Sequence, residues 1–283
     1  MKQVNVENHD YLCVEVFPRL GLEGVFNDAL MAAMKNGEPT IILEASAKYG
    51  KNNEDLLVIK PRLDLNEEDG RYYANAITAS LTQPGKESFS LQFDLYAQKG
   101  YSIDDMYKMM DAKYIHQDIK RRDGTRTERW SRVEFKKNEE GKLVPYLRHE
   151  YSDSTNFNLI KELGRLPLGM TQQEKEDMIF DMKHGDPGVA MIRKPDGSRE
   201  RVTLVPNPKT AQIHVFDRNG NRLMLNDNKV RVETSQKFVV VGSEDNNNIT
   251  PAAARMLEGG NDQGEGQDRG RGQGQGRGGR RAG

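Results

Sequence analysis

Apolar residues recur every three to four positions in two distant stretches of this chain, and both stretches end in nearly the same six letters. The first stretch, from Leu22 to Met34, runs into MKNGEP at 34–39, and the second, 171–184, runs into MKHGDP at 182–187. This spacing places apolar side chains along one face of a helix. We therefore predict two amphipathic helices that end in the same way.

The end of each predicted helix carries a glycine, with a proline two residues later. Gly37 and Gly185 suit the left-handed conformation that closes a helix, and Pro39 and Pro187 prevent the helix from continuing. An apolar run typical of a strand follows in both places. A glycine loop can also cradle a ligand, but a helix cap that turns into a sheet is the more common use. We adopt the cap as our interpretation.

The likeness extends further when the chain is compared with itself at an offset of 148 residues. Over positions 20–39 this offset gives six identical pairs, among them the glycine and the proline of each copy. In the second copy, Thr171 and Glu174 have the spacing of a capping box, which marks the start of a helix. We predict two related helix-plus-sheet units that arose by internal duplication.

The first unit, assigned to residues 1–112, consists mainly of segments in which apolar and polar residues alternate. Alternation is clearest in SFSLQFDLY and is typical of a strand with one buried face. Asp69-Gly70 and Pro84-Gly85 are turn dipeptides between such segments. Ser102 and Asp105 have the spacing to cap a helix that continues through Met109. The predicted strands of this unit are 10–17, 41–46, 55–60, 71–81 and 88–97.

The second unit, assigned to residues 155–242, begins with a short helix in FNLIKEL, followed by the capped helix at 171–184. Asp196-Gly197 and Asn219-Gly220 are typical of tight hairpin turns, which join antiparallel strands. Helices combined with mostly antiparallel strands place the chain in the α+β class, with two helix-plus-antiparallel-sheet units. The predicted strands of the second unit are 188–194, 199–206, 211–217, 221–225, 229–233 and 236–241.

Residues 113–154 have no counterpart in the repeat and form a charged hairpin insertion in our interpretation, with RTERWSRVEF and KLVPYLRHEY as its strands. On a strand, Trp130 shares one face with Arg126 and Arg132. That face would present an indole among cations, an arrangement suited to base stacking. In the alternative, the tryptophan packs against a neighbouring unit. The candidate nucleic-acid-binding residues of this segment are Arg121, Arg122, Arg126, Arg129, Trp130 and Arg132.

From residue 243 onward the periodicity stops, and glycine, glutamine and arginine dominate. So few apolar side chains cannot offset the entropy lost on ordering, so we predict that 243–283 is disordered. Arginine alternating with glycine is typical of segments that follow a nucleic-acid backbone. Asp262, Glu265 and Asp268 dilute this charge, so a tail that only aids solubility fits equally well. The candidate tail residues are Arg269, Arg271, Arg277, Arg280 and Arg281.

Charge and cysteine content narrow the choice of partners only slightly. The chain has 42 basic and 43 acidic residues, a formal net charge of −1, so no overall field favours nucleic acid or membrane. Cys13 is the single cysteine, which excludes an internal disulfide and fits a reducing compartment. We interpret it as a core residue on a strand. No apolar run is long enough to span a bilayer, so we expect no membrane association and a cytoplasmic location.

The sequence contains no recognisable catalytic or cofactor motif. Its five histidines do not pair at metal-ligand spacing, and phosphate loops and nucleophile elbows are absent. The segments DLNEEDG and DRNGN lack the glycine and glutamate positions of a calcium loop. We therefore expect no metal, no cofactor and no enzymatic activity.

One segment resembles a known family. Residues 166–223 contain a Leu-Pro-led helix, a Gly-x-Pro exit, strands with Asp-Gly and Asn-Pro turns, and a closing Asp-x-Asn-Gly. In these motifs the segment resembles an uncharacterised α+β domain family of Bacteroidetes conjugative and mobile elements, whose members often end in tails rich in Gly, Gln, Lys and Arg. The resemblance implies a context, an accessory protein of mobile DNA in the cytoplasm of a gut anaerobe. It implies no activity and no catalytic residues.

These observations lead to two functional hypotheses. In the first, the chain is a non-enzymatic accessory protein of a mobile element, and its hairpin and tail bind DNA or RNA weakly through electrostatic contacts. In the second, it is a protein-interaction or scaffold module, and exposed sheet edges recruit a partner protein or a second copy of the chain.

Overall fold

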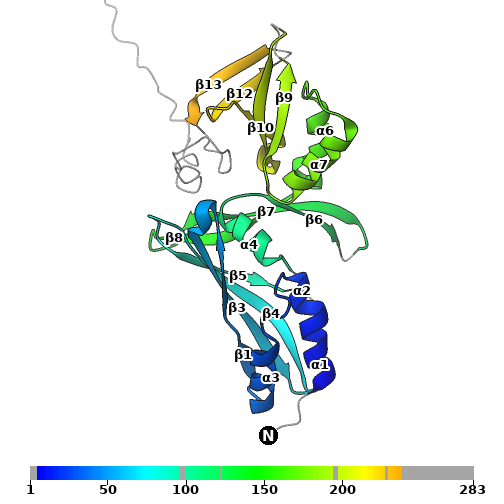
Figure 1. Ribbon diagram of the computed structural model, residues 1–283, viewed down its shortest axis with the longest axis vertical. Coiled ribbons are helices and arrows are strands. Elements are labelled where there is room, and N and C mark those ends of the chain that lie inside the picture. Colours follow the sequence, from blue (N-terminus) through cyan, green and yellow to red (C-terminus); the bar gives the residue numbers. More distant parts are fainter. Residues whose placement is uncertain (1–4, 96–99, 122, 194–196, 227–228, 238–283) are drawn as a thin grey trace, which may run out of the picture.

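The computed structural model describes residues 5–95, 100–121, 123–193, 197–226 and 229–237, with side chains described as far as Leu223. Figure 1 shows an elongated molecule with one sheet towards each end and a three-stranded sheet between them. Neighbouring strands within the three sheets pair antiparallel, as in β3 with β4, β7 with β8 and β9 with β10. Helices combine with antiparallel sheets, so the predicted α+β class is confirmed. The predicted disorder of 243–283 falls outside the described residues.

The chain begins with a helical segment where we predicted a strand. Helix α1 (Val6–Tyr11) continues through a wider π turn (Leu12–Val16) into α2 (Phe17–Arg19), so the predicted strand at 10–17 is wrong. Leu12, Val16 and Leu20 are fully buried at helical spacing, whereas Val14 is 68% exposed. The β-branched and aromatic letters of YLCVEVF suggested a strand, but the longer pattern of burial follows a helix.

The first sheet follows helix α3 (Asn27–Asn36), which ends at Gly37 in the left-handed conformation with φ of 65°. Strands β1 (Thr40–Ile42) and β2 (Ala45–Tyr49) pair with β3 (Asp55–Asn66) in one continuous register. A single 3₁₀ turn, Lys51–Asn53, separates β2 from β3, and β4 (Arg71–Thr82) and β5 (Phe89–Asp94) complete a meander. Helix α4 (Ile103–Met110) follows, and both halves of the predicted Ser102–Asp105 capping box are present.

The predicted charged hairpin is part of a three-stranded sheet, which we call the central sheet. It consists of β6 (Ile115–Lys120), β7 (Arg126–Lys137) and β8 (Leu143–Tyr151) in the order β6-β7-β8. The two predicted strands are β7 and β8, and β6 is the strand that the sequence analysis missed. Short helices α5 (Ser152–Thr155) and α6 (Leu159–Gly164) lead out of this sheet.

The second end sheet follows helix α7 (Gln172–Lys183), which begins at the predicted Thr171–Glu174 capping box. Gly185 has φ of 83°, so both predicted glycine corners adopt the left-handed conformation. Strands β9 (Gly188–Arg193), β10 (Arg199–Asn207), β11 (Gln212–Phe216), β12 (Asn221–Asn226) and β13 (Lys229–Lys237) then form a five-stranded meander, with a 3₁₀ turn at Pro208–Thr210.

The two faces of the central sheet belong to different hydrophobic cores. Ile115 and Val133 lie in the core formed with α1–α4 and the first sheet. Tyr114, beside the start of β6, and Trp130 lie in the core formed with α6, α7 and the strands β9–β12. Because adjacent residues of a strand point to opposite faces, this one layer supplies side chains to both halves of the molecule. The first half contains α1–α4 and the first sheet, and the second half contains α6, α7 and the strands β9–β13.

Both end sheets are thus meanders that begin after a helix and a left-handed glycine. The second corner contacts the other half of the molecule: Lys108 on α4 donates to the backbone oxygen of His184 at 2.9 Å and pairs with Asp186 at 2.7 Å. The unit boundaries and the internal duplication stay predictions.

Candidate nucleic-acid interface

The proposed stacking residue Trp130 is fully buried. Its indole packs edge-on against Phe157, with ring centroids 5.4 Å apart, and against His116 at 4.9 Å. The strand alternation that placed Trp130 on the same face as Arg126 and Arg132 is correct, but this part of that face is covered by the second half of the molecule. Of the two interpretations, the one in which the tryptophan packs against a neighbouring unit describes the structure. Trp130 is not available for base stacking.

Two further candidates, Arg129 and Arg132, are partly buried and engaged in contacts within the molecule. The Arg129 guanidinium lies 5.7 Å from the ring centroid of Tyr101 and donates to Gln117. The Arg132 side chain is 13% exposed, lies 4.5 Å from the ring centroid of Tyr114 and pairs with Glu134. Both arginines act as structural cations at the two faces of the central sheet.

Burial by itself would raise the pKa of Glu134, but hydrogen bonds from Arg132 and Tyr146 outweigh it and hold that pKa below its ordinary value. Glu134 is therefore ionised and compensates the Arg132 charge. This internal ion pair explains why the density of arginines on β7 does not by itself make an exposed basic surface.

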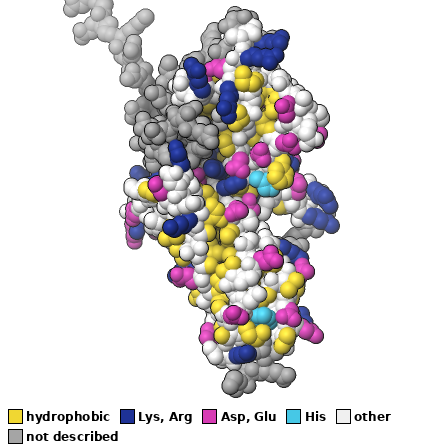
Figure 2. All heavy atoms as spheres, viewed as in Figure 1, with side chains coloured by type: hydrophobic (Ala, Val, Ile, Leu, Met, Phe, Trp, Pro, Cys, Tyr) yellow, Lys and Arg dark blue, Asp and Glu magenta, His cyan; other side chains and the backbone are white. Residues whose placement is uncertain are grey.

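The free end of the β6–β7 hairpin keeps the exposed basic residues. Lys120 and Arg126 are exposed and directly opposite each other across the two strands. Arg121, beside them, pairs with Asp153 at 2.6 Å and is 41% exposed. In Figure 2, Lys and Arg side chains gather at this hairpin end. Arg122 lies outside the described residues, as do Arg269, Arg271, Arg277, Arg280 and Arg281.

A second basic group, which the sequence analysis missed, lies at the end of β9 and β10. Arg193, Arg199 and Arg201 are exposed, and Arg193 is directly opposite Arg199. Their alternation with Ile192, Glu200 and Val202 is readable in the sequence, but the register that brings two strands' arginines together is not. Figure 2 shows this second gathering of basic side chains at the far end of the molecule.

Like charges directly opposite on neighbouring strands destabilise a sheet unless something compensates them. Inside the central sheet the opposed pair Arg132 and Arg148 is compensated, because Arg132 pairs with Glu134 and Arg148 with Glu150 at 2.8 Å. Neither Lys120–Arg126 nor Arg193–Arg199 forms an ion pair with any residue that the structure describes. Both hairpin ends therefore present exposed pairs of basic side chains to solvent.

Two half-buried histidines contribute no positive charge near neutral pH. Burial lowers the pKa of His149 to about 4, with a further contribution from Arg129, and lowers the pKa of His214 to about 4, with contributions from Arg222 and Arg132. His149 is hydrogen-bonded to Ser131 at 2.7 Å, and His214 to Asn207 at 3.1 Å. Both serve as neutral structural polar groups.

The described residues include one group with the chemistry to hold a metal ion, formed by His116, Asp118 and Glu128. The sequence analysis expected no metal site. The His-x-Asp spacing on a strand was a readable signal for two of the three side chains, because residues two apart share a face. The third side chain comes from the neighbouring strand.

Within the described residues, no helix is both long enough and apolar enough to cross a bilayer. Comparison with protein families, with curated proteins and with solved structures finds no match to this chain.

Proposed function

We propose that this chain is a non-enzymatic protein that binds DNA or RNA through the phosphate backbone, using the ends of two hairpins. The observation that carries the proposal is that Lys120 lies opposite Arg126 and Arg193 opposite Arg199, in exposed basic pairs that form no ion pair with any described residue. A sheet that exposes such pairs gains free energy when a polyanion lies over them.

The chemistry of these residues favours phosphate. An arginine guanidinium offers paired N–H donors that match two phosphate oxygens, and a lysine ammonium adds a point charge. With no exposed aromatic residue at either hairpin end among the described residues, binding rests on charge rather than on stacking. We therefore expect affinity that is weak, insensitive to base sequence and strongly reduced by salt.

The tail arginines extend the same proposal. A glycine-rich segment that carries Arg269, Arg271, Arg277, Arg280 and Arg281 would add further phosphate contacts to those of the hairpins. The family resemblance of residues 166–223 supports the wider setting that we propose, an accessory protein of a conjugative or other mobile element that acts in the cytoplasm.

A binding titration tests this function. Fluorescently labelled single- and double-stranded oligonucleotides are titrated with the full chain at about 50 and 200 mM salt. The site variant R126A/R193A/R199A/R201A is compared with K48A/K60A/R62A/R71A, which removes the same charge from exposed positions on the first sheet. A further variant lacks residues 243–283.

We expect the site variant to bind at least about tenfold more weakly, with a smaller salt dependence, while the matched control changes little. Loss of the tail should weaken binding further. Equal weakening by the site variant and the control would show that net charge alone matters, and it would overturn the assignment to the hairpin ends. Unchanged affinity in the site variant without its tail would overturn the function itself.

A second function is supported by the free edge of the first sheet. Strands β1 and β2 pair only with β3 among the described strands, and Ile42 on this edge is 63% exposed. An exposed edge can accept a strand from a protein partner or from a second copy. Sedimentation of the purified chain over a concentration series tests self-association. A dimer that Ile42→Lys dissociates would favour this function over nucleic-acid binding.

A further inference from the structure

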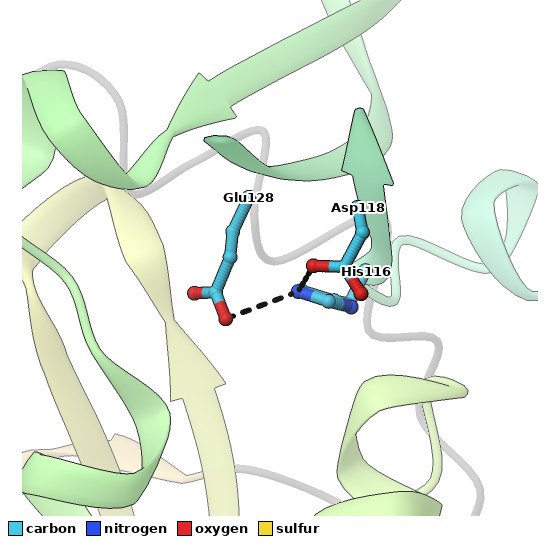
Figure 3. A group of neighbouring side chains, drawn as sticks. All are labelled: His116, Asp118 and Glu128. Carbon is cyan, nitrogen blue, oxygen red and sulfur yellow. Dashed lines mark ion pairs between the residues drawn. The ribbon is translucent and has the colours of Figure 1, made fainter. Parts of the chain in front are cut away.

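Three side chains with metal-ligand chemistry converge on one face of the β6–β7 hairpin. His116 and Asp118 lie two residues apart on β6, and Glu128 lies directly opposite Asp118 on β7. The His116 Nε2 atom is 3.7 Å from Asp118 Oδ1 and 3.5 Å from Glu128 Oε1, and one ligand atom of each residue lies within 4.8 Å of the other two. Figure 3 shows the imidazole and the two carboxylates pointing towards one another.

Burial holds the His116 side chain in place. Its side chain is only 6% exposed, its ring packs against Trp130, and its Nε2 atom is buried without a hydrogen-bond partner among the described residues. Leaving a buried polar atom unsatisfied costs about 1–3 kcal/mol. Since Nε2 faces two carboxylates, a cation placed between them would satisfy all three groups at once.

The neighbours of Glu128 keep its carboxylate in position. Ser152 on α5 donates to Glu128 Oε2 at 3.1 Å, and Lys183 Nζ on α7 lies 3.9 Å from Oε1. Asp118, in contrast, is 74% exposed and forms the open side of the group. His116 is therefore buried, Glu128 is oriented by its neighbours, and Asp118 faces solvent. The exposed side gives an ion a route of access.

We propose that His116, Asp118 and Glu128 form a binding site for a divalent first-row transition-metal ion such as Zn²⁺. In a tetrahedral zinc site with bonds of about 2.0–2.1 Å, ligand atoms are separated by about 3.3 Å. The separations of 3.7 and 3.5 Å from Nε2 exceed that value only slightly. An imidazole with two carboxylates suits Zn²⁺, Co²⁺, Ni²⁺ or Mn²⁺, whereas Ca²⁺ and Mg²⁺ prefer oxygen ligands throughout. A water molecule would complete the coordination on the exposed side.

Binding would also change the charge at the hairpin. Lys120 and Arg126 occupy the next opposed pair along the same face of the two strands, nearer the hairpin end. An ion of charge +2 neutralises the two carboxylates and leaves these basic residues without nearby negative charge. This consequence rests on the proposed nucleic-acid function, whereas the metal site itself does not.

The single tryptophan provides the measurement. Trp130 contacts His116, with ring centroids 4.9 Å apart, so a paramagnetic ion at the site should quench its fluorescence. The full chain is titrated with Co²⁺ or Ni²⁺ while this fluorescence is followed, and calorimetry with Zn²⁺ measures the stoichiometry. The variants are D118N, which alters an exposed side chain, and E128Q. The matched control is H184Q, which removes a histidine at the end of α7, outside the group.

We expect one ion per chain, and we expect D118N and E128Q to require at least about tenfold more metal for half-quenching. H184Q should behave as the unaltered chain does. Because Asp118 is exposed, D118N should fold normally, and its thermal unfolding without metal checks this. Quenching of the same strength in D118N and the unaltered chain would overturn the site. Loss of the bound ion in H184Q would also overturn it, because the ion would then sit at α7.

Discussion

The two faces of the central sheet carry different chemistry, although the same three strands supply both. The face towards the first half is mainly apolar, with Val133 in the core and a hydroxyl contact of 2.6 Å between Tyr101 and Ser131. The face towards the second half buries Trp130 beside charged groups, among them the Arg132–Glu134 pair. One sheet can therefore join two cores of unlike polarity, because alternate side chains point to opposite sides.

The two faces differ in whether their charged side chains are paired within the protein or exposed to solvent. On the second face, Arg132 near Trp130 is compensated by a carboxylate and an aromatic ring, whereas beyond Glu128 the same face carries the exposed pair Lys120 and Arg126. We expect the two halves that meet at this sheet to respond differently to four changes: truncation of a core side chain, acid, substitution of a corner glycine and removal of a surface contact. The loss of unfolding free energy should decrease in that order.

Removing the large side chain of the second face should have the greatest effect on stability. Trp130→Ala opens a cavity in the second core and should lower the free energy of unfolding by about 3–5 kcal/mol. Tyr101→Phe removes only the hydroxyl contact on the first face and should cost about 1 kcal/mol. Urea denaturation followed by circular dichroism measures both values, and similar losses for the two variants would contradict the comparison.

Acid should destabilise the protein through both faces. His149 on the first face and His214 against the second have pKa values lowered to about 4 by burial. Between pH 6.5 and 4 the unfolded chain binds protons that the folded chain does not, so stability falls as the pH falls through this window. Above pH 6.5 neither the folded nor the unfolded chain binds a proton at these histidines, so their contribution to stability is fully present and no longer changes with pH. His214 contributes up to about 3 kcal/mol, and His149, which solvent screens more, contributes about 1–2 kcal/mol.

The variants His149→Gln and His214→Gln test this pH dependence separately. Each should flatten the fall in unfolding free energy between pH 6.5 and 4, as measured by denaturant melts at several pH values. Asn36→Gln gives the control, because it changes an exposed side chain that does not titrate and should leave the slope unchanged. A slope that neither buried histidine alters would show that carboxylates alone set the acid response.

The two glycine corners should differ in sensitivity. Gly185→Ala would place a side chain on a residue with a left-handed φ of 83°, which strains the backbone. The new Cβ would also clash with Ile115, whose Cδ1 atom would lie 2.7 Å away. Gly37→Ala meets the left-handed φ of 65°. We expect losses of about 2 kcal/mol at Gly185 and about 1 kcal/mol at Gly37, measured as unfolding free energies. Equal losses would indicate that backbone strain dominates at both corners.

The smallest effect should come from the surface contact between the halves. Lys108→Met removes the pair with Asp186 and the hydrogen bond to the His184 backbone, and should cost about 0.5–1 kcal/mol. Hydrogen exchange locates the effect, which should appear at the end of α7. Lys48→Met is the control at an exposed position away from the junction.

Much of the local structure was predictable, because its signals are local. Both capping boxes, both glycine corners and the alternation along β7 follow from residues close in sequence. The strand predicted at 10–17 failed because seven letters of high β-propensity outweighed the helical spacing of a longer window. Strand β6 was missed because IHQDIK alternates too weakly to stand out without its partner β7.

Local sequence patterns were enough to predict the α+β class and which side chains share a face of each strand, since caps, turns and the period of two depend only on neighbouring residues. Tertiary structure alone decided which faces are covered. It buried Trp130, compensated Arg132, set Arg193 opposite Arg199 and brought Glu128 to His116. The reason is physical: strand register and layer contacts join residues far apart in the chain, and no local pattern specifies those partners.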